Sequence, residues 1–431
     1  MIDLSKITSI VGNHVPPYLY GKHFVPGETL IPYSGPYWDS REAIAAINTF
    51  LNGSWITAGE NVDAFEKEFS HKFNVKHSLM VNSGSSANLV MLTALKQYYG
   101  WKADDGIIVS PVGFPTTVSV IVQNNLTPVF ADIEWDTLNF DLDRVAERMY
   151  DWVKAIIVSP VLGNPPDMDR LMEICRRHDI KLILDGCDSL GSRWDGRYLN
   201  EYAVASSCSF YPAHHICTGE GGMVSTDDID LMRIMRSIAW WGRDCTCVGE
   251  ANMLKDGSCG RRFGKWLEAY DGVVDHKYVF SQMGYNLKPL DLQGAIGRVQ
   301  LEKFDEIDRR RKRSKYIIEP ILTSNIEGVK SVQQFEKSDV CWFGVPFICE
   351  TKELKQELVQ FLEQNKIQTR NYFSGNILLH PGYYWLSDCN DYPEANQVLD
   401  KVFFLGCAPH YEEPVFEYIY NVIKQWNINH S

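Results

Sequence analysis

From about residue 40 onward, two kinds of hydrophobic pattern alternate along the chain. Stretches with apolar residues at helical spacing, such as REAIAAINTFLN and SSANLVMLTALKQYY, are followed by short apolar runs typical of strands, such as GIIVSPV and KLILDG. This alternation predicts an α/β domain in which helices flank a mainly parallel sheet.

The later part of the chain shows a different pattern. We expect a long charged helix over residues 292–317, which would connect the α/β domain to a smaller one. The predicted parts are an N-terminal extension at 1–30, a large domain at 31–305 with a cysteine-rich insertion near 240–280, and a smaller C-terminal α+β domain at 306–431.

Composition narrows the class of protein. A formal net charge of −13 disfavours nucleic acid or an anionic membrane surface as a partner. No leader pattern opens the sequence and no run approaches the roughly 20 apolar residues of a membrane span, so we expect a cytoplasmic protein. The 11 cysteines are an odd number, and several stand inside apolar runs. They should be reduced in the cytosol, which leaves some free to bind a metal.

Two short motifs carry candidate chemistry. Gly84, Ser85 and Ser86 follow a predicted strand and open a helix, where amides and hydroxyls can hold a phosphate, although a plain helix cap is the simpler interpretation. Asp185 ends the apolar strand KLIL, at the edge where parallel strands open toward a crevice. A carboxylate there can pair with the protonated ring nitrogen of a cofactor or merely cap a turn.

Five segments taken together resemble one family, the DegT/DnrJ/EryC1/StrS sugar aminotransferases, a branch of the fold-type I pyridoxal phosphate (PLP) enzymes. They are VNSGSSAN (81–88), SPVGFPTTVS (110–119), LILDGCDSLGS (182–192), SFYPAHHICTGEGG (209–222) and MGYNLKPLDLQ (283–293). The resemblance implies a fold-type I aminotransferase-like architecture, with a mainly parallel seven-stranded sheet in the large domain.

The resemblance also implies roles for single residues. Phe114 resembles the aromatic residue that stacks on the cofactor ring, and Ser209 resembles a phosphate-binding serine. Asn286 resembles the asparagine that reaches the phosphate from the neighbouring subunit, which implies a homodimer with a shared site.

The chain departs from the family at His214. Family aminotransferases read S-F-x-x-x-K at this place, whereas the text here is SFYPAH and no lysine occurs between Lys181 and Lys255. Imidazole cannot bind the cofactor aldehyde covalently, but it is a competent general base. We therefore expect non-covalent pyridoxamine 5′-phosphate (PMP). His215 could be the base instead; His214 is preferred because it stands at the lysine offset from Ser209.

A histidine in this position resembles the small subgroup of sugar 3-dehydratases, which remove the carbon 3 hydroxyl from a nucleotide-linked 4-keto-6-deoxyhexose. One branch, the CDP-4-keto-6-deoxyglucose 3-dehydrases of 3,6-dideoxyhexose and O-antigen biosynthesis, carries a 2Fe-2S cluster. That branch takes electrons from an NADH-dependent iron–sulfur flavoprotein reductase. The other branch acts on GDP-4-keto-6-deoxymannose without a cluster.

Cysteine spacing favours the iron–sulfur branch. In this chain 57 residues separate Cys187 from Cys245, 1 separates Cys245 from Cys247, and 11 separate Cys247 from Cys259. The pattern resembles that of the iron–sulfur dehydrases if VGEANMLKDGS contains an insertion of four residues. Four thiolates are the usual ligands of a 2Fe-2S cluster, although four cysteines can also bind zinc and Cys187 alone could be a buried apolar residue.

Several assignments stay open at this point. Asp188 could hydrogen-bond to the cofactor or to His214, or could simply be an acid at the start of a helix. Tyr211 could touch the substrate or pack in the core. The diphosphate could be held by Arg243, Arg261, Arg262 or Arg370. A non-catalytic binding or regulatory homologue that lost its lysine is the alternative from another functional class.

Overall fold

The computed structural model describes residues 6, 9–11, 24–53, 55–245 and 261–430. Among the predicted site residues, Cys247 and Cys259 lie outside the described residues.

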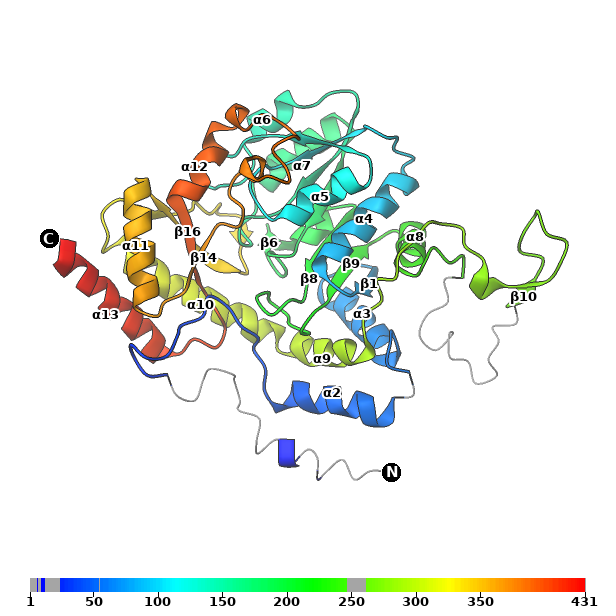
Figure 1. Ribbon diagram of the computed structural model, residues 1–431, viewed down its shortest axis with the longest axis horizontal. Helices are drawn as coiled ribbons and strands as arrows, with labels where there is room; N and C mark the ends of the chain where they lie inside the picture. The colour runs from blue at the N-terminus through cyan, green and yellow to red at the C-terminus, as the bar shows by residue number, and fades with distance from the viewer. Residues whose placement is uncertain (1–5, 7–8, 12–23, 54, 246–260, 431) are drawn as a thin grey trace.

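A seven-stranded sheet forms the centre of the larger part of the molecule (Figure 1). Its strands, in spatial order, are β1 (His77–Val81), β9 (Gly222–Thr226), β8 (Ala205–Ser209), β5 (Lys181–Asp185), β4 (Val153–Val158), β2 (Gly106–Val109) and β3 (Thr127–Phe130). Only β9 runs antiparallel to its two neighbours. The prediction of a mainly parallel α/β sheet is therefore confirmed.

Alternate residues of the central strands enter two different hydrophobic clusters. Ile107 and Ile183 belong to one cluster, whereas Ile108 and Leu182 belong to the other. Because side chains alternate across a strand, both faces of the sheet are covered, which explains why apolar residues follow one another directly in β2 and β5. The helices are α2 (Ser40–Asn52), α3 (Glu60–Lys72), α4 (Gly84–Tyr98), α5 (Pro115–Gln123), α6 (Leu142–Glu147), α7 (Met168–Arg177), α8 (Ile229–Ala239) and α9 (Asp291–Glu302).

A second, antiparallel sheet is built from β12 (Val329–Ser331), β14 (Gly344–Cys349), β16 (Val402–Gly406) and β15 (Thr369–Asn371), in this spatial order. It is accompanied by α10 (Phe304–Thr323), α11 (Lys352–Gln364), α12 (Pro393–Lys401) and α13 (Glu413–His430). The domain boundaries at residues 30 and 305 stay a prediction. None of the helices in the described part of the chain combines the length and the apolar character that a bilayer span requires.

The single long helix expected over 292–317 is two helices. They are α9 and α10, which meet at Lys303. The interruption allows α9 to pack against α2 and α3 while α10 packs against α13 and the second sheet. Side-chain periodicity does not reveal such a break, because Lys303 continues the charged pattern of the sequence around it.

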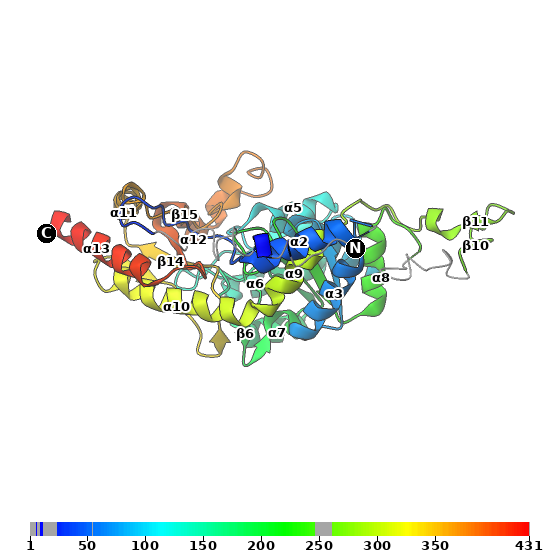
Figure 2. The same ribbon diagram turned by 90° about the horizontal axis from the view of Figure 1, so that it is seen from below.

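The remaining elements are short. A small three-stranded sheet consists of β13 (Ser338–Asp339), β6 (Arg193–Trp194) and β7 (Arg197–Tyr198), in this spatial order. The short 3-10 helices are η1 (Leu199–Tyr202), η3 (His276–Tyr278), η4 (Ile377–Leu379) and η5 (Cys389–Asp391). Residues 261–285, here called the arm, contain β10 (Phe263–Gly264) and β11 (Val274–Asp275). Figures 1 and 2 show the strands of the arm projecting away from the large sheet, on the side of α8.

Candidate active site

Four of the five segments singled out in the sequence meet at one cavity of about 740 Å³. It lies where β5 ends at Asp185 and β8 ends at Ser209, at the carboxyl edge of the sheet. The predicted residues that line it are Gly84, Ser85, Phe114, Asp185, Cys187, Asp188, Ser209, Tyr211 and His214. Two other predicted cofactor-binding residues, Ser86 and Asn286, are not part of its wall.

The first turn of α4 offers a cradle for a phosphate. The hydroxyl of Ser83 caps the helix and accepts a hydrogen bond from the Ser86 amide at 3.1 Å, which explains why Ser86 stands back from the cavity. A Cβ atom on Gly84 would lie 2.5 Å from Cβ of Ser209 and 3.1 Å from Sγ of Cys187. Glycine is therefore the residue that fits here, and the helix start remains open to an anion.

Asp185 is a buried carboxylate held by uncharged donors. Its side chain accepts hydrogen bonds from Asn88 Nδ2 at 2.8 Å and from Thr117 Oγ1 at 2.7 Å. It is 3% exposed, and among the described residues no cation forms an ion pair with it. This arrangement suits a carboxylate that pairs with a cationic ring nitrogen. Asn88 and Thr117 stood inside the motifs noted in the sequence, yet the sequence alone did not reveal their role.

His214 and Asp188 face each other at the cavity. Nδ1 of His214 lies 3.4 Å from Oδ1 of Asp188. Burial, reinforced by the positive charge of Arg311, lowers the pKa of His214 to about 3. Burial and the nearby charge of Asp185 raise the pKa of Asp188 well above its usual range. A neutral imidazole is the form that can accept a proton.

The two adjacent histidines have different surroundings. His214 is part of the cavity wall, and its ring packs against Phe343 with 5.1 Å between centroids. His215 is buried, and its Nε2 lies 2.9 Å from the backbone oxygen of Cys341. The geometry thus brings His214 into the cavity and keeps His215 in the core.

Two large aromatic rings border the cavity. Phe114 is 50% exposed and Tyr211 is 47% exposed, so neither ring is packed in the core. Phe114 contacts Phe373 edge to face at 6.0 Å between centroids, and Tyr211 approaches His214 at 6.4 Å. Both rings can therefore contact a ligand, and their individual roles stay predictions.

The predicted cysteines are only partly described. Cys187 is half-buried in the cavity wall, and burial together with Asp185 raises the pKa of its thiol well above the usual range. Cys245 is half-buried and precedes the arm. Within the described ranges no three His, Cys, Asp or Glu side chains are grouped as metal ligands. Since Cys247 and Cys259 fall outside those ranges, the cluster stays a prediction.

Asn286 and the candidate arginines fall in different places. Asn286 is exposed, and its side-chain oxygen accepts a hydrogen bond from Lys288 Nζ at 2.6 Å. Arg370 lines the cavity and stacks over the ring of Tyr33 at 4.1 Å. Arg262 is paired with Asp275 in the arm at 2.5 Å. Of the four arginines named above, Arg370 is the one in the cavity wall.

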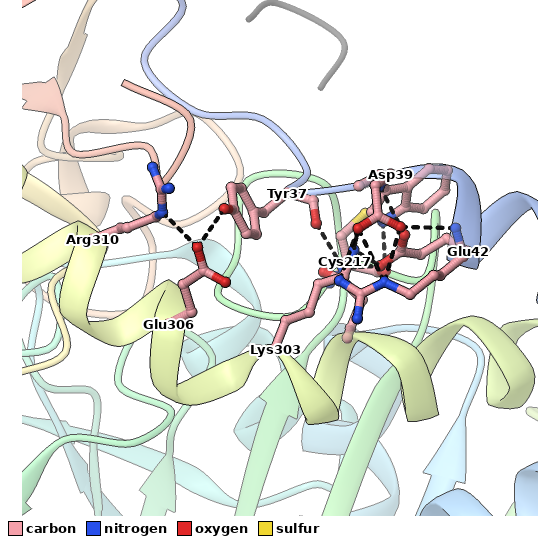
Figure 3. Close-up of polar contacts among 10 residues, drawn as sticks. Tyr37, Asp39, Glu42, Cys217, Lys303, Glu306 and Arg310 are labelled. Carbon is pink, nitrogen blue, oxygen red and sulfur yellow. Dashed lines mark hydrogen bonds and ion pairs between the residues drawn. The ribbon is translucent and has the colours of Figure 1, made fainter. Parts of the chain in front are cut away.

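Hydrogen bonds from other parts of the chain hold the segment that carries His214. We call residues 210–221, between β8 and β9, the histidine loop. The backbone oxygen of Cys217 accepts from Trp38 Nε1 at 3.2 Å, and its amide donates to Gln300 Oε1 at 3.3 Å. Gln300 in turn donates to Glu42 at 2.6 Å. Figure 3 shows this contact region, where Lys303 pairs with Glu42 at 2.6 Å and with Asp39 at 3.0 Å.

The fold and the cavity at the carboxyl edge of its sheet define an α/β enzyme scaffold of the aminotransferase type. Comparison with known sequences agrees: the chain belongs to the DegT/DnrJ/EryC1/StrS aminotransferase family, which it matches over residues 38–424.

Several known proteins are similar to this chain over most of its length. The chain is 37% identical to the dTDP-4-dehydro-2,6-dideoxy-D-glucose 3-dehydratase of Saccharopolyspora spinosa, over 94% of this chain and 88% of that protein. It is 35% identical to the lipopolysaccharide biosynthesis protein RfbH of Salmonella typhimurium, over 98% and 97%. The E. coli GDP-4-keto-6-deoxy-D-mannose-3-dehydratase with bound hydrated PLP superimposes with a TM-score of 0.80, at 28% identity, over 92% of this chain and all of that one (100%).

Proposed function

We propose that this protein is a PMP-dependent 3-dehydratase that removes the carbon 3 hydroxyl of a nucleotide-linked 4-keto-6-deoxyhexose in 3,6-dideoxyhexose biosynthesis. The observation that carries the proposal is His214, an imidazole in the cavity wall at the position where the sequence resemblance implies the lysine of the family aminotransferases. No lysine is found among the described residues that line this cavity. Similarity to two proteins named as sugar 3-dehydratases supports the same conclusion.

The cavity has the groups that PMP requires. Gly84 and Ser85 at the helix start, with Ser209 beside them, would hold the phosphate. Asp185 would pair with the ring nitrogen, and Phe114 would stack on the ring. When bound, PMP supplies an amine that reacts with a sugar ketone and a ring that accepts electrons. A solved relative that contains PLP supports this choice of cofactor.

His214 would act as the general base. Burial and Arg311 lower its pKa, so the imidazole is neutral at physiological pH, which is the protonation state that a general base must have. Asp188 faces Nδ1 and would orient the ring, as second groups do in other proton-transferring pairs. Tyr211 lies on the same side of the cavity and would contact the sugar or the cofactor.

The substrate is proposed to be a nucleotide sugar, with CDP as the first nucleotide to test. Arg370 in the cavity wall offers a planar cation with several donors, which suits a phosphate oxygen. The named relatives act on dTDP- and GDP-linked sugars, so these nucleotides belong in the same panel.

A 2Fe-2S cluster held by Cys187, Cys245, Cys247 and Cys259, with an NADH-dependent iron–sulfur flavoprotein reductase as partner, completes the proposal. Support comes from Cys187, which shares the cavity wall with Asp185, so that one of the proposed ligands would lie beside the proposed cofactor site. Without added charge from a metal, burial keeps that thiol protonated, whereas a bound metal favours the thiolate. Iron analysis after anaerobic purification separates this proposal from a cluster-free dehydratase.

We also propose a homodimer that works in the cytoplasm. Asn286 is exposed and stands outside the cavity of its own chain, as expected if it serves the site of a second copy. The arm beside it exposes large apolar side chains, including Phe263 and Met283.

The function is tested by incubating the protein anaerobically with PMP and a panel of CDP-, dTDP-, UDP- and GDP-linked 4-keto-6-deoxyhexoses, with and without a reductant. Mass spectrometry should show loss of the carbon 3 oxygen from one of them. The His214→Asn variant should lose this activity, by several orders of magnitude if His214 is the essential base, while it still binds PMP. Unchanged turnover by His214→Asn would contradict the assignment.

A further inference from the structure

Arg311 is a buried cation that donates mainly to backbone oxygens. It lies in α10 and is 1% exposed. Among the described residues no carboxylate lies within ion-pair distance of its guanidinium, although the same helix contains other arginines that do form ion pairs, such as Arg310 and Arg313. A buried charge without a counter-ion is expensive, so an apolar side chain of similar length would stabilise the fold better unless the donors of Arg311 are needed.

The two terminal nitrogens of Arg311 donate mainly to backbone oxygens of two segments, and one of them also lies 3.7 Å from Sγ of Cys407. One terminal nitrogen donates to His214 at 3.0 Å and to Ala213 at 3.4 Å. The other donates to Phe343 at 3.2 Å and to Trp342 at 3.3 Å. A planar guanidinium can serve two groups of acceptors in different directions, which a lysine ammonium at the end of a flexible chain does less well.

These contacts hold both the loop that carries the His214 imidazole and the segment that carries the ring packed against it. The histidine loop is held through the Ala213 and His214 oxygens, and the Ala213 oxygen also accepts from Ser34 Oγ at 2.7 Å. The second segment holds Phe343, the ring against which His214 packs. The His214 oxygen is turned toward Arg311, while the side chains of His214 and His215 lie in different places, one in the cavity and one against Cys341.

We infer that Arg311 is a positioning residue that makes His214, rather than His215, the imidazole of the cavity. The inference rests on the proposed function, in which His214 is the base. Arg311 itself is not part of the cavity wall, so it acts through the backbone of the histidine loop and through Phe343.

The first test measures which histidine a reagent can reach, and it needs no substrate. The full-length protein is treated with diethyl pyrocarbonate, and tandem mass spectrometry gives the separate labelling rates of His214 and His215. We expect His214 to be labelled much faster than His215 in the natural protein, and PMP to slow the labelling of His214. In Arg311→Met the ratio of the two rates should fall toward one, with the circular dichroism spectrum unchanged.

The second test measures turnover. Arg311→Met should lower kcat by about 100-fold, the size of effect that a displacement of about 1 Å produces at a reacting group, with little change in KM. Arg311→Lys keeps a cation but loses the fork, so kcat should be lower than in the natural protein and higher than in Arg311→Met. Arg313→Met removes an ion-paired arginine from the same helix and should change neither the labelling ratio nor kcat.

The inference is overturned if folded Arg311→Met keeps the labelling ratio of the natural protein, or if Arg313→Met changes that ratio equally. If Arg311→Met does not fold, Arg311→Lys decides: an unchanged ratio together with an unchanged kcat shows that the fork is not required. The proposed function can fail separately, because the labelling ratio would still respond to Arg311 in a protein whose His214→Asn variant remains active.

Discussion

The histidine loop and the arm are held in opposite ways. The backbone of the loop accepts hydrogen bonds from Trp38 and Arg311 and donates one to Gln300, and these three residues lie in three other parts of the chain. The arm has pairs of its own, such as Arg262 with Asp275 and the ring of Trp266 stacked on His276 at 4.0 Å, and it contacts the preceding residues 238–244, for example through His276 and Asp244 at 2.6 Å. Segments far apart in the sequence therefore determine where His214 lies, whereas the arm leaves large apolar side chains such as Phe263 and Met283 exposed.

The largest effect should follow from breaking the ion pairs behind the histidine loop. Lys303 pairs with Glu42, which is fully buried, and with Asp39. Lys303→Met would leave Glu42 without its cation, and breaking such a buried pair costs about 3–5 kcal/mol of unfolding free energy. Urea denaturation followed by circular dichroism measures the loss. Lys67→Met, which breaks the exposed pair with Asp63, is the control and should cost less than about 1 kcal/mol.

The prediction is contradicted if Lys303→Met loses no more unfolding free energy than Lys67→Met. The ion pairs of Lys303 would then contribute little to the stability of this region. The double variant Lys303→Met with Glu42→Gln should recover part of the stability, because the unpaired charge is then removed as well.

A buried histidine outside the loop, His410, should also make the protein sensitive to acid. His410 is buried, and burial together with Arg311 lowers its pKa to about 4. The unfolded chain binds a proton at this histidine near pH 6.5, earlier than the folded chain. Folding stability is thus unaffected above about pH 6.5 and falls as the pH decreases toward 4, by at most about 3 kcal/mol from this residue.

His410→Gln cannot titrate and should flatten part of this decline. The measurement is the urea midpoint at several values between pH 7 and pH 4.5, compared with His71→Gln, which replaces an exposed histidine. Equal slopes for His410→Gln and the natural protein would contradict the prediction.

The sequence predicted the parts of the site that depend on local pattern. Asp185 was placed at a strand end by the apolar run before it, and the structure has it there. The role of Arg311 could not be predicted, because its main partners are backbone oxygens at 213–214 and 342–343, and a backbone oxygen is present whatever the side chain. The helix break and the buried ion pairs at Lys303 could not be predicted either, because the residues around it are charged as well and the pattern does not show which of them is buried.

A contact at the start of the loop should control cofactor binding. Gly84→Ala would place a methyl group 2.5 Å from Cβ of Ser209, so the helix start or the loop has to move. Overpacking of this kind costs about 1–3 kcal/mol, and we expect the Kd for PMP to rise about tenfold or more. Fluorescence titration with PMP measures it. Gly382→Ala, where an added methyl group has no neighbour within 4 Å, should leave the Kd unchanged.

The smallest effect on the stability of the chain itself is expected in the arm. Met283 is 96% exposed, so Met283→Ser removes no intramolecular packing and should change the unfolding free energy by less than about 0.5 kcal/mol. If a second copy covers the arm, the same substitution removes a methionine that the dimer would bury, which is worth about 1.5–3 kcal/mol, and it should weaken dimerisation at least tenfold. Sedimentation velocity over a range of concentrations measures this.

Tyr316→Ser is the control. It changes a side chain that is 79% exposed on α10, away from the arm, and should not affect dimerisation. A large loss of unfolding free energy in Met283→Ser with unchanged association would mean that the arm, like the histidine loop, is held by its own chain.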